Sequence, residues 1–187
     1  MASTTQENLM RAITGESLAR NKYTFFAIRA REDGFEGIAR IFEETAGNEM
    51  EHAEKLLDCV KDKVTADAEP SIAPVSATAE NLKAAAAGEK YEWGEMYPGF
   101  EKTAKNEGDE KTAKVFKEIG EVEEKHEERY LALAKRVEDG TVFKRETEIE
   151  WKCLNCGYTH KGTEAPEECP ACGKPQAWYE PRSYNWK

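Results

Sequence analysis

Two Glu-x-x-His tetrads constrain this sequence more than any other feature. The first runs from Glu49 to His52 and the second from Glu123 to His126. Residues three apart on an α-helix project from the same side, so each tetrad directs one carboxylate and one imidazole to a common point. Such a pair of tetrads supplies half of the ligands that a dinuclear metal site needs.

Two glutamates that follow glycines supply the other half. Glu16 and Glu89 each lie about a helix length before the corresponding tetrad. Apolar residues recur at helical spacing around these glutamates, which therefore occupy stripes that should face a core. The stretches with this spacing run from Thr4 to Gly34, from Ile38 to Val60, from Glu80 to Asn106 and from Asp109 to Glu138.

The two helix pairs form an internal repeat. At 1.5 Å per residue, the glutamates lie roughly 22 to 28 Å from the turns expected at Gly34 and Gly108, so they should converge at mid-bundle. The spacing from Glu89 to Gly108 in the second half is one residue longer than the spacing from Glu16 to Gly34 in the first half. We ascribe this extra residue to an insertion near the turn at Gly108. Residues 65 to 78, with Pro70 and Pro74, cannot continue a helix and predict a crossover linker.

Buried carboxylates at this depth require cations. Burying them as bare charges would cost several kcal/mol each, which a net stability of roughly 5 to 15 kcal/mol cannot absorb. One Glu from each of two helices, with Glu-x-x-His from each of the other two, is the pattern of di-iron and di-manganese carboxylate bundles. The predicted fold is therefore mostly α, a ferritin-like four-helix bundle with a crossover linker over residues 1–140.

Glu92 breaks the repeat, because Ala19 occupies the equivalent position in the first half. Oxidation of two Fe(II) ions adds positive charge, and the harder Fe(III) prefers oxygen ligands to imidazole. We therefore predict that one iron exchanges His52 for Glu92 when it is oxidised. Tyr23 and Tyr97 are candidates to donate hydrogen bonds to ligating carboxylates. The alternative is that they are packed aromatic side chains with hydrated hydroxyl groups.

A separate metal unit is predicted over residues 151–187, after a linker over residues 141–150. It contains two Cys-x-x-Cys motifs, which are Cys153 with Cys156 and Cys169 with Cys172. Four thiolates at this spacing make a tetrahedral site for iron or for a structural zinc. Cys59 stands alone and is interpreted as a small buried hydrophobic residue.

The net charge of −10 and the pI near 5.0 argue against nucleic acid as a partner, since phosphate binding needs a basic patch. No apolar run approaches the roughly 20 residues needed to cross a membrane, and the first residues lack the pattern of a signal peptide. The predicted location is the cytoplasm, where Cys-x-x-Cys pairs bind metals rather than form disulfides.

With both parts in view, the sequence closely resembles the rubrerythrin family, in which a ferritin-like di-iron domain precedes a rubredoxin-like domain. The stretches that carry the resemblance are Gly15–Tyr23, Asn48–Ala53, Asn81–Glu89, Glu92–Pro98, Glu123–Glu127 and Cys153–Cys172. The resemblance implies that the irons are bound by Glu16, Glu49, Glu89, Glu92, Glu123 and His126, with His52 as the alternate ligand in the reduced state. It also implies a rubredoxin-type Fe(Cys)4 centre rather than zinc in the tail.

The family's activity implies a hydrogen peroxide reductase in oxidative-stress defence, an NADH-linked peroxidase that works through separate electron carriers. Peroxide would be reduced to water at the non-haem di-iron site, and the rubredoxin-like iron would return the electrons. Expected partners are a donor such as rubredoxin with an NAD(P)H-dependent reductase, and a second copy of the chain in a head-to-tail homodimer or higher oligomer. The alternatives are a ferroxidase or iron-handling ferritin-like protein and a peroxide or oxygen sensor, both of which a zinc-containing tail would favour.

Overall fold

The structure, a computed structural model, describes residues 4–63, 65 and 74–184, and Pro70 of the predicted crossover lies outside them. Its helices in chain order are α1 (Thr5–Glu32), α2 (Glu36–Leu57), α3 (Thr78–Tyr91), the π-helix η1 (Glu92–Met96), α4 (Tyr97–Asn106) and α5 (Glu110–Glu138). They are followed by β1 (Lys144–Cys153), β2 (Thr159–Glu164), the short 3-10 helix η2 (Gln176–Trp178) and β3 (Tyr179–Pro181). The prediction of a ferritin-like bundle with a small C-terminal metal domain is confirmed.

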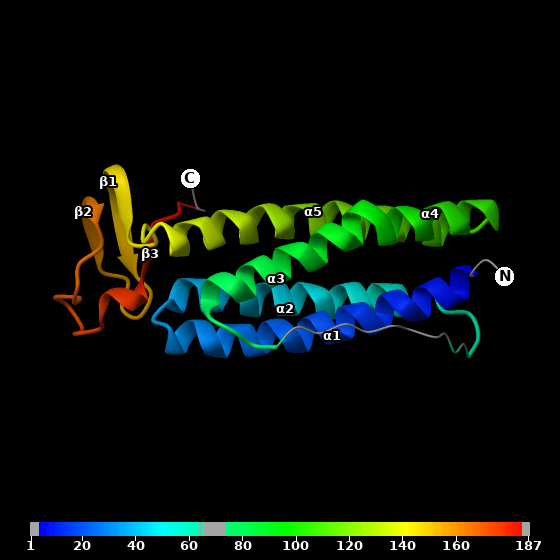
Figure 1. The fold of residues 1–187 in the computed structure, drawn as a ribbon, viewed down its shortest axis with the longest axis horizontal. Helices are drawn as coiled ribbons and strands as arrows, with labels where there is room; N and C mark the ends of the chain where they lie inside the picture. Colours follow the sequence, from blue (N-terminus) through cyan, green and yellow to red (C-terminus); the bar gives the residue numbers. More distant parts are fainter. Residues whose placement is uncertain (1–3, 64, 66–73, 185–187) are drawn as a thin grey trace.

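The bundle consists of two antiparallel helix pairs (Figure 1). One pair is α1 with α2, and the other is the line of α3, η1 and α4 with α5. Thr4 and Glu7 form a capping box that begins α1. Gly34 and Gly108 have φ of 85° and 76° at the two turns, a conformation that glycine adopts without steric cost.

The third long helix differs from its prediction as one α-helix from Glu80 to Asn106. Residues Glu92–Met96 form a π-turn within it, in which the backbone N–H of Tyr97 donates to the carbonyl of Glu92. A π-turn holds one residue more than an α-turn. The extra residue of the second half therefore lies here, beside Glu92, and not near the turn at Gly108.

Apolar layers enclose the centre of the bundle on both sides. One layer, toward the α1–α2 turn, includes Tyr23, Phe42 and Tyr130. The other, toward the opposite end, includes Leu9 and Phe116. The carboxylates of the predicted metal site lie between these layers, where water has little access.

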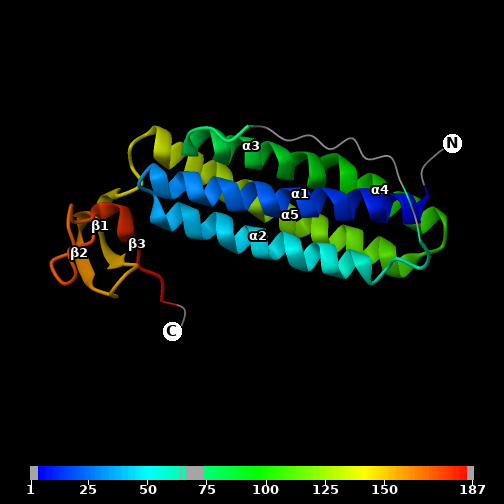
Figure 2. The same ribbon diagram turned by 90° about the horizontal axis from the view of Figure 1, so that it is seen from below.

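The β-sheet domain sits at the end of the bundle where α1 turns into α2 (Figure 2). Its sheet has the antiparallel order β2-β1-β3, and Trp151 is fully buried in its core. Strand β1 begins at Lys144, so most of the segment predicted as a linker over 141–150 is a strand instead. Its charged residues tolerate this because the sheet is exposed and Lys144 and Glu150 lie opposite Glu164 and Lys161 of β2. Phe35 stacks on Phe143 with ring centroids 6.1 Å apart, which joins the two domains.

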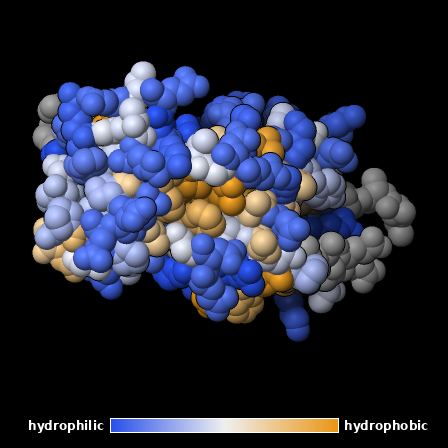
Figure 3. All heavy atoms as spheres, turned by 60° about the vertical axis from the view of Figure 1, so that its left-hand side comes forward, coloured by the Kyte–Doolittle hydropathy of each residue, from blue (hydrophilic) through white to orange (hydrophobic). Residues whose placement is uncertain are grey.

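The face of the molecule in Figure 3 is mostly hydrophilic, with its largest hydrophobic area near the centre of the view. Within the described ranges, no helix combines the length and the apolar character needed to cross a bilayer.

Candidate metal centres

Glutamates from four helices meet in the middle of the bundle. Glu16 of α1 and Glu89 of α3 are each 1% exposed, and Glu49 of α2 and Glu123 of α5 are fully buried. They form two overlapping groups of possible ligands in which the ligand atoms lie within 4.8 Å of one another. The first group is Glu16, Glu49, His52 and Glu123, and the second is Glu49, Glu89, Glu123 and His126. Glu49 and Glu123 belong to both, which is the arrangement of carboxylates that bridge two metals.

The two histidines complete the groups from opposite sides. His52 Nδ1 lies 2.9 Å from a Glu123 oxygen, 3.0 Å from a Glu49 oxygen and 3.6 Å from a Glu16 oxygen. His126 Nδ1 lies 2.7 Å from the other Glu123 oxygen and 3.5 Å from Glu49. Each imidazole therefore points at its own group while the bridging carboxylates face both.

The residues fit metal ions because several of their buried polar atoms, although close to one another, make no hydrogen bond of regular geometry. These atoms include Glu16 Oε2, Glu49 Oε1, Glu89 Oε2, both carboxylate oxygens of Glu123 and His126 Nδ1. Buried polar groups are almost always hydrogen-bonded or bound to a metal, since leaving one unsatisfied costs roughly 1 to 3 kcal/mol. A cluster of such atoms facing one another is the signature of a cation site.

The electrostatics of the protein alone support the same conclusion. Burial, reinforced by the charge of Glu123, raises the pKa of Glu89 to about 8. Burial also raises the pKa of Glu49. Burial opposes a charged His52, but the carboxylates of Glu123, Glu16 and Glu49 that lie close to its Nδ1 outweigh burial and raise the pKa of this imidazole. Without a metal, protons must therefore neutralise these charges.

Glu92 is the predicted ligand that stays outside both groups. It begins the π-turn, and its pKa is raised well above the usual value by burial and by the charges of Glu16 and Glu89. Six of the seven predicted bundle ligands are thus brought together, with His52 rather than Glu92 in the first group.

Two tyrosines hold the terminal carboxylates in a reciprocal way. The hydroxyl of Tyr23 on α1 donates to Glu89 on α3, and that of Tyr97 on α4 donates to Glu16 on α1. Both tyrosines are 1% exposed, so their hydroxyl groups are not hydrated as the alternative interpretation required. Each helix pair therefore orients a ligand of the other.

Sequence reasoning did not identify the residues that hold the π-turn. Trp93 donates from its indole to Glu127, and Tyr97 packs against Gly120. The signal that was available is the extra residue between Glu89 and Gly108, which a π-turn explains and a turn insertion does not.

The four C-terminal cysteines form a second, compact centre. Cys153 Sγ lies 3.8 Å from Cys172 Sγ, and Cys156 Sγ lies 3.7 Å from Cys169 Sγ. Sulfurs bound at about 2.3 Å around a tetrahedral metal are spaced by about 3.8 Å, so the four thiols match such a site. The backbone N–H of Lys174 faces the sulfur of Cys172 and lowers the pKa of that thiol, which favours the ligating thiolate.

Comparison with known proteins agrees with both centres. Residues 7–134 match the family model described as Rubrerythrin, and residues 151–180 match the model described as Rubrerythrin, rubredoxin-like domain. A rubrerythrin from Porphyromonas gingivalis is 48% identical over 187 residues, which cover 98% of this chain and 92% of that protein. A rubrerythrin from Nitratidesulfovibrio vulgaris is 46% identical over 98% of this chain and 97% of its own. A solved structure of nigerythrin in a mixed-valence state has a TM-score of 0.67 at 37% identity, covering 97% of this chain and 88% of that one.

Proposed function

Since this chain belongs to the rubrerythrin family of non-haem di-iron oxidoreductases, we propose that it is a peroxidase that reduces hydrogen peroxide to water. The observation that carries the proposal is the pair of buried ligand groups that share Glu49 and Glu123. Two metals held by shared carboxylates stay close enough to act on one small substrate together. The four cysteines supply a separate site for electron return.

The bundle is the site of two non-haem irons, and the cysteines are the site of one rubredoxin-type iron. Glu16, Glu49, His52 and Glu123 would hold the first bundle iron, and Glu49, Glu89, Glu123 and His126 the second. When bound, the two irons supply the two electrons that reduction of one peroxide molecule needs, and the cysteine-bound iron supplies their replacements one at a time.

The protein's own part is to hold the ligands in place and to keep water out. The Tyr23 and Tyr97 hydroxyl groups orient Glu89 and Glu16. The apolar layers that contain Phe42 and Phe116 close the site from both ends. A dry, fixed ligand set strengthens every electrostatic interaction within it and limits side reactions.

We further propose that Glu92 replaces His52 as a ligand of the first iron on oxidation. The structure has His52 in the ligand group and Glu92 outside it, which is the arrangement proposed for the reduced state. Crystal structures of the protein in both redox states test this directly. An iron that keeps the same ligand in both states would exclude the exchange.

Electron return is proposed to occur between subunits of a head-to-tail homodimer. The cysteine domain lies beside the α1–α2 turn, and Glu49 lies on α2 roughly 20 Å from that turn. A partner's cysteine domain placed beside the bundle would shorten this distance. The proposed donors in the cytoplasm are a rubredoxin and an NAD(P)H-dependent reductase.

Mixed dimers test the route of electrons. One subunit carries Cys156→Ser and the other carries Glu123→Gln, so that neither has both centres. Recovery of peroxidase activity in the mixture is expected if electrons pass between subunits. No recovery would indicate transfer within one chain.

Stopped-flow absorbance tests the activity itself. The fully reduced protein is mixed with two equivalents of hydrogen peroxide per chain, enough to accept the three electrons that its three irons hold, and the absorbances of both iron centres are followed. Rapid oxidation of both is expected for a peroxidase. Oxidation by oxygen alone, with no response to peroxide, would instead support the ferroxidase alternative.

A further inference from the structure

The π-turn that carries Glu92 is attached to α5 at two points. At the first, the Trp93 indole nitrogen donates to Glu127 Oε2 at 2.6 Å. At the second, Tyr97, which follows the π-turn, packs against Gly120. The two attachments bracket the turn, since Trp93 is its second residue and Tyr97 closes it by donating to the carbonyl of Glu92.

The Trp93 attachment is reinforced by a cation. Lys90 Nζ lies 3.7 Å from the centre of the Trp93 ring and 4.0 Å from Glu127 Oε2. The Glu127 side chain is 16% exposed, so its hydrogen bond to the indole is partly shielded from water. Glu127 directly follows the ligand His126, so this attachment joins the π-turn to the part of α5 that holds the second iron.

The Gly120 attachment depends on a missing side chain. A Cβ on Gly120 would lie 3.2 Å from Cβ of Tyr97, closer than most Cβ contacts in proteins. Glycine in a helix costs about 1 kcal/mol relative to alanine, so this position gives up helix stability for a close approach. Tyr97 is also the donor to Glu16, so its placement against α5 fixes a ligand of the first iron.

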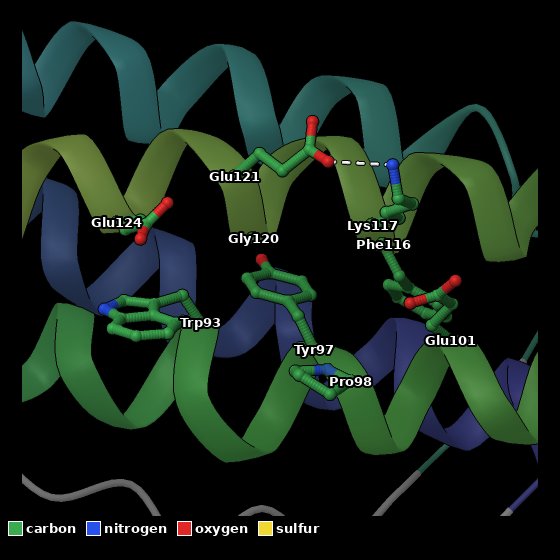
Figure 4. Close-up of a pocket in the computed structure, with 9 residues that line it drawn as sticks. All are labelled: Trp93, Tyr97, Pro98, Glu101, Phe116, Lys117, Gly120, Glu121 and Glu124. Atoms are coloured by element: carbon green, nitrogen blue, oxygen red, sulfur yellow. Dashed lines mark hydrogen bonds and ion pairs between the residues drawn. The ribbon is translucent and has the colours of Figure 1, made fainter.

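Beside the two attachments lies a pocket of about 190 Å³ (Figure 4). Trp93 and Tyr97 project from one wall toward α5, and Gly120 and Glu124 lie on the other. On this side of the π-turn, a pocket rather than packed side chains therefore separates Trp93 and Tyr97 from part of α5. Tyr97 is held in addition by the core, where its ring lies 6.1 Å from that of Phe116.

We propose that these attachments, Trp93 to Glu127 and Tyr97 to Gly120, form a clasp that holds Glu92 outside the ligand set and so favours His52 as the ligand. Trp93, Glu127 and Gly120 are then positioning residues, which act through the π-turn and not on substrate. The inference rests on the proposed exchange of His52 for Glu92. In the structure the clasp is closed, and Glu92 belongs to neither ligand group.

The main test is Trp93→Phe, which keeps an aromatic ring and removes the indole donor. A loosened clasp lets Glu92 reach the oxidised iron more easily, so the oxidised state is favoured and the reduction potential of the di-iron centre falls. We expect a change of about tenfold in the redox equilibrium, the size typical of one hydrogen bond to a charged acceptor. That is about 59 mV in a one-electron step, measured by redox titration of the full-length, iron-loaded protein. An unchanged or higher potential would overturn the proposal.

Two matched pairs of variants separate the clasp from general effects on α5 and on helix stability. Glu127→Gln keeps an acceptor but weakens its hydrogen bond with Trp93, so the reduction potential should fall less than in Trp93→Phe. Its control is Glu128→Gln, whose side chain pairs with Lys125 and not with the π-turn. Gly120→Ala pushes on Tyr97, while its control Gly47→Ala adds a Cβ that meets nothing within 4 Å. Equal changes of the di-iron reduction potential in a variant and in its control would contradict the clasp.

Glu92→Gln distinguishes failure of the clasp from failure of the proposed exchange. This variant alone should raise the di-iron potential if Glu92 binds the oxidised iron, and an unchanged potential would refute the exchange itself. The Trp93→Phe effect should vanish in the Glu92→Gln background, and its persistence would refute the clasp alone.

A readout independent of redox is Co(II) titration of the metal-free protein. The bundle ligands of Trp93→Phe are intact, so its Co(II) stoichiometry and affinity should match the unaltered protein within about twofold. Loss of Co(II) binding would show that Trp93 supports the whole site rather than the position of Glu92, and would overturn the proposal.

Discussion

The two metal centres of this chain are built in opposite ways. The bundle centre collects its ligands from four helices between Glu16 and His126, and its carboxylates are buried. The cysteine centre takes all four ligands from two short knuckles between Cys153 and Cys172, and Cys156 is exposed. The first centre is therefore part of the core of its domain, whereas the second is a local cross-link between two short loops. Loss of metal should have different consequences in the two places.

Glu123→Gln is the substitution expected to have the largest effect on the bundle centre. Glu123 belongs to both ligand groups, so the substitution weakens both iron sites at once. Replacing residues that only support a metal ligand costs 10 to 100-fold, so loss of a shared ligand should lower peroxidase activity by more than about 100-fold. Metal analysis of the purified variant should find iron at the cysteines alone.

The cysteine centre is the internal control for this variant. Its visible absorption should be unchanged in Glu123→Gln, because no cysteine contacts the carboxylate cluster. A variant that kept both bundle irons would contradict the assignment of Glu123 as a bridging ligand.

Cys156→Ser is the converse experiment and should have the next largest effect. The rubredoxin-type absorption should disappear, and turnover with an external electron donor should fall by at least about tenfold because electrons no longer return to the bundle. The prereduced variant should still be oxidised once by peroxide in a stopped-flow experiment. Failure of that single oxidation would show that the two centres are not separable.

The cysteine centre could be predicted from the sequence more directly than the bundle centre, for a physical reason. The cysteine knuckles are local, so spacing alone predicted the four thiols that the structure brings together. The carboxylate cluster required helical periodicity to be read across four stretches, which was possible because Glu16 and Glu89 interrupt apolar stripes.

Periodicity could not predict the π-turn at Glu92. A single extra residue in a helix is visible in the sequence only as a change of spacing, which does not say where along the helix the residue is accommodated. Strand β1 was missed from Lys144 to Glu150 because its side chains are mostly charged and the sheet is small and exposed, so no alternation of apolar residues marks it.

Removing the metals should reveal a pH dependence in the bundle. The carboxyl groups of Glu49, Glu89 and Glu92 have raised pKa values in the folded protein, that of Glu89 about 8 against the usual 4.5. The folded state then binds more protons than the unfolded state, so stability falls as pH rises between about 4.5 and 8. His52, whose pKa is also raised, acts in the same direction above about pH 6.5.

Thermal unfolding followed by circular dichroism measures this dependence. The metal-free protein should lose several kcal/mol of stability from about pH 5 to pH 8, at up to roughly 1.4 kcal/mol per pH unit for each group. The iron-loaded protein should change much less, because bound cations replace the protons. A metal-free bundle that is as stable at the higher pH as at the lower one would mean that its carboxylates are not buried as described.

A milder perturbation compares the two sides of the di-iron site. Tyr23→Phe removes the donor to Glu89, and Tyr97→Phe removes the donor to Glu16. Each should lower activity or metal affinity by about 10 to 100-fold. Tyr97→Phe should have the larger effect on the first iron, and Tyr23→Phe on the second, as measured by stepwise Co(II) titration. Identical effects of both variants on both sites would contradict the reciprocal arrangement.

The smallest expected effect lies at the junction between the two centres. Arg40 pairs with Glu36 and donates to the backbone carbonyl of Leu154 beside the cysteine knuckle. The Arg40 side chain is 45% exposed, so Arg40→Gln should cost less than about 1 kcal/mol, seen as a small fall in the urea midpoint. Lys114→Gln, which removes an exposed pair with Glu118 near the start of α5 at the opposite end of the bundle, is the control. Because the knuckle ligands are local, the rubredoxin-type absorption should not change in either variant. Altered absorption in Arg40→Gln alone would show that the cysteine centre depends on the bundle after all.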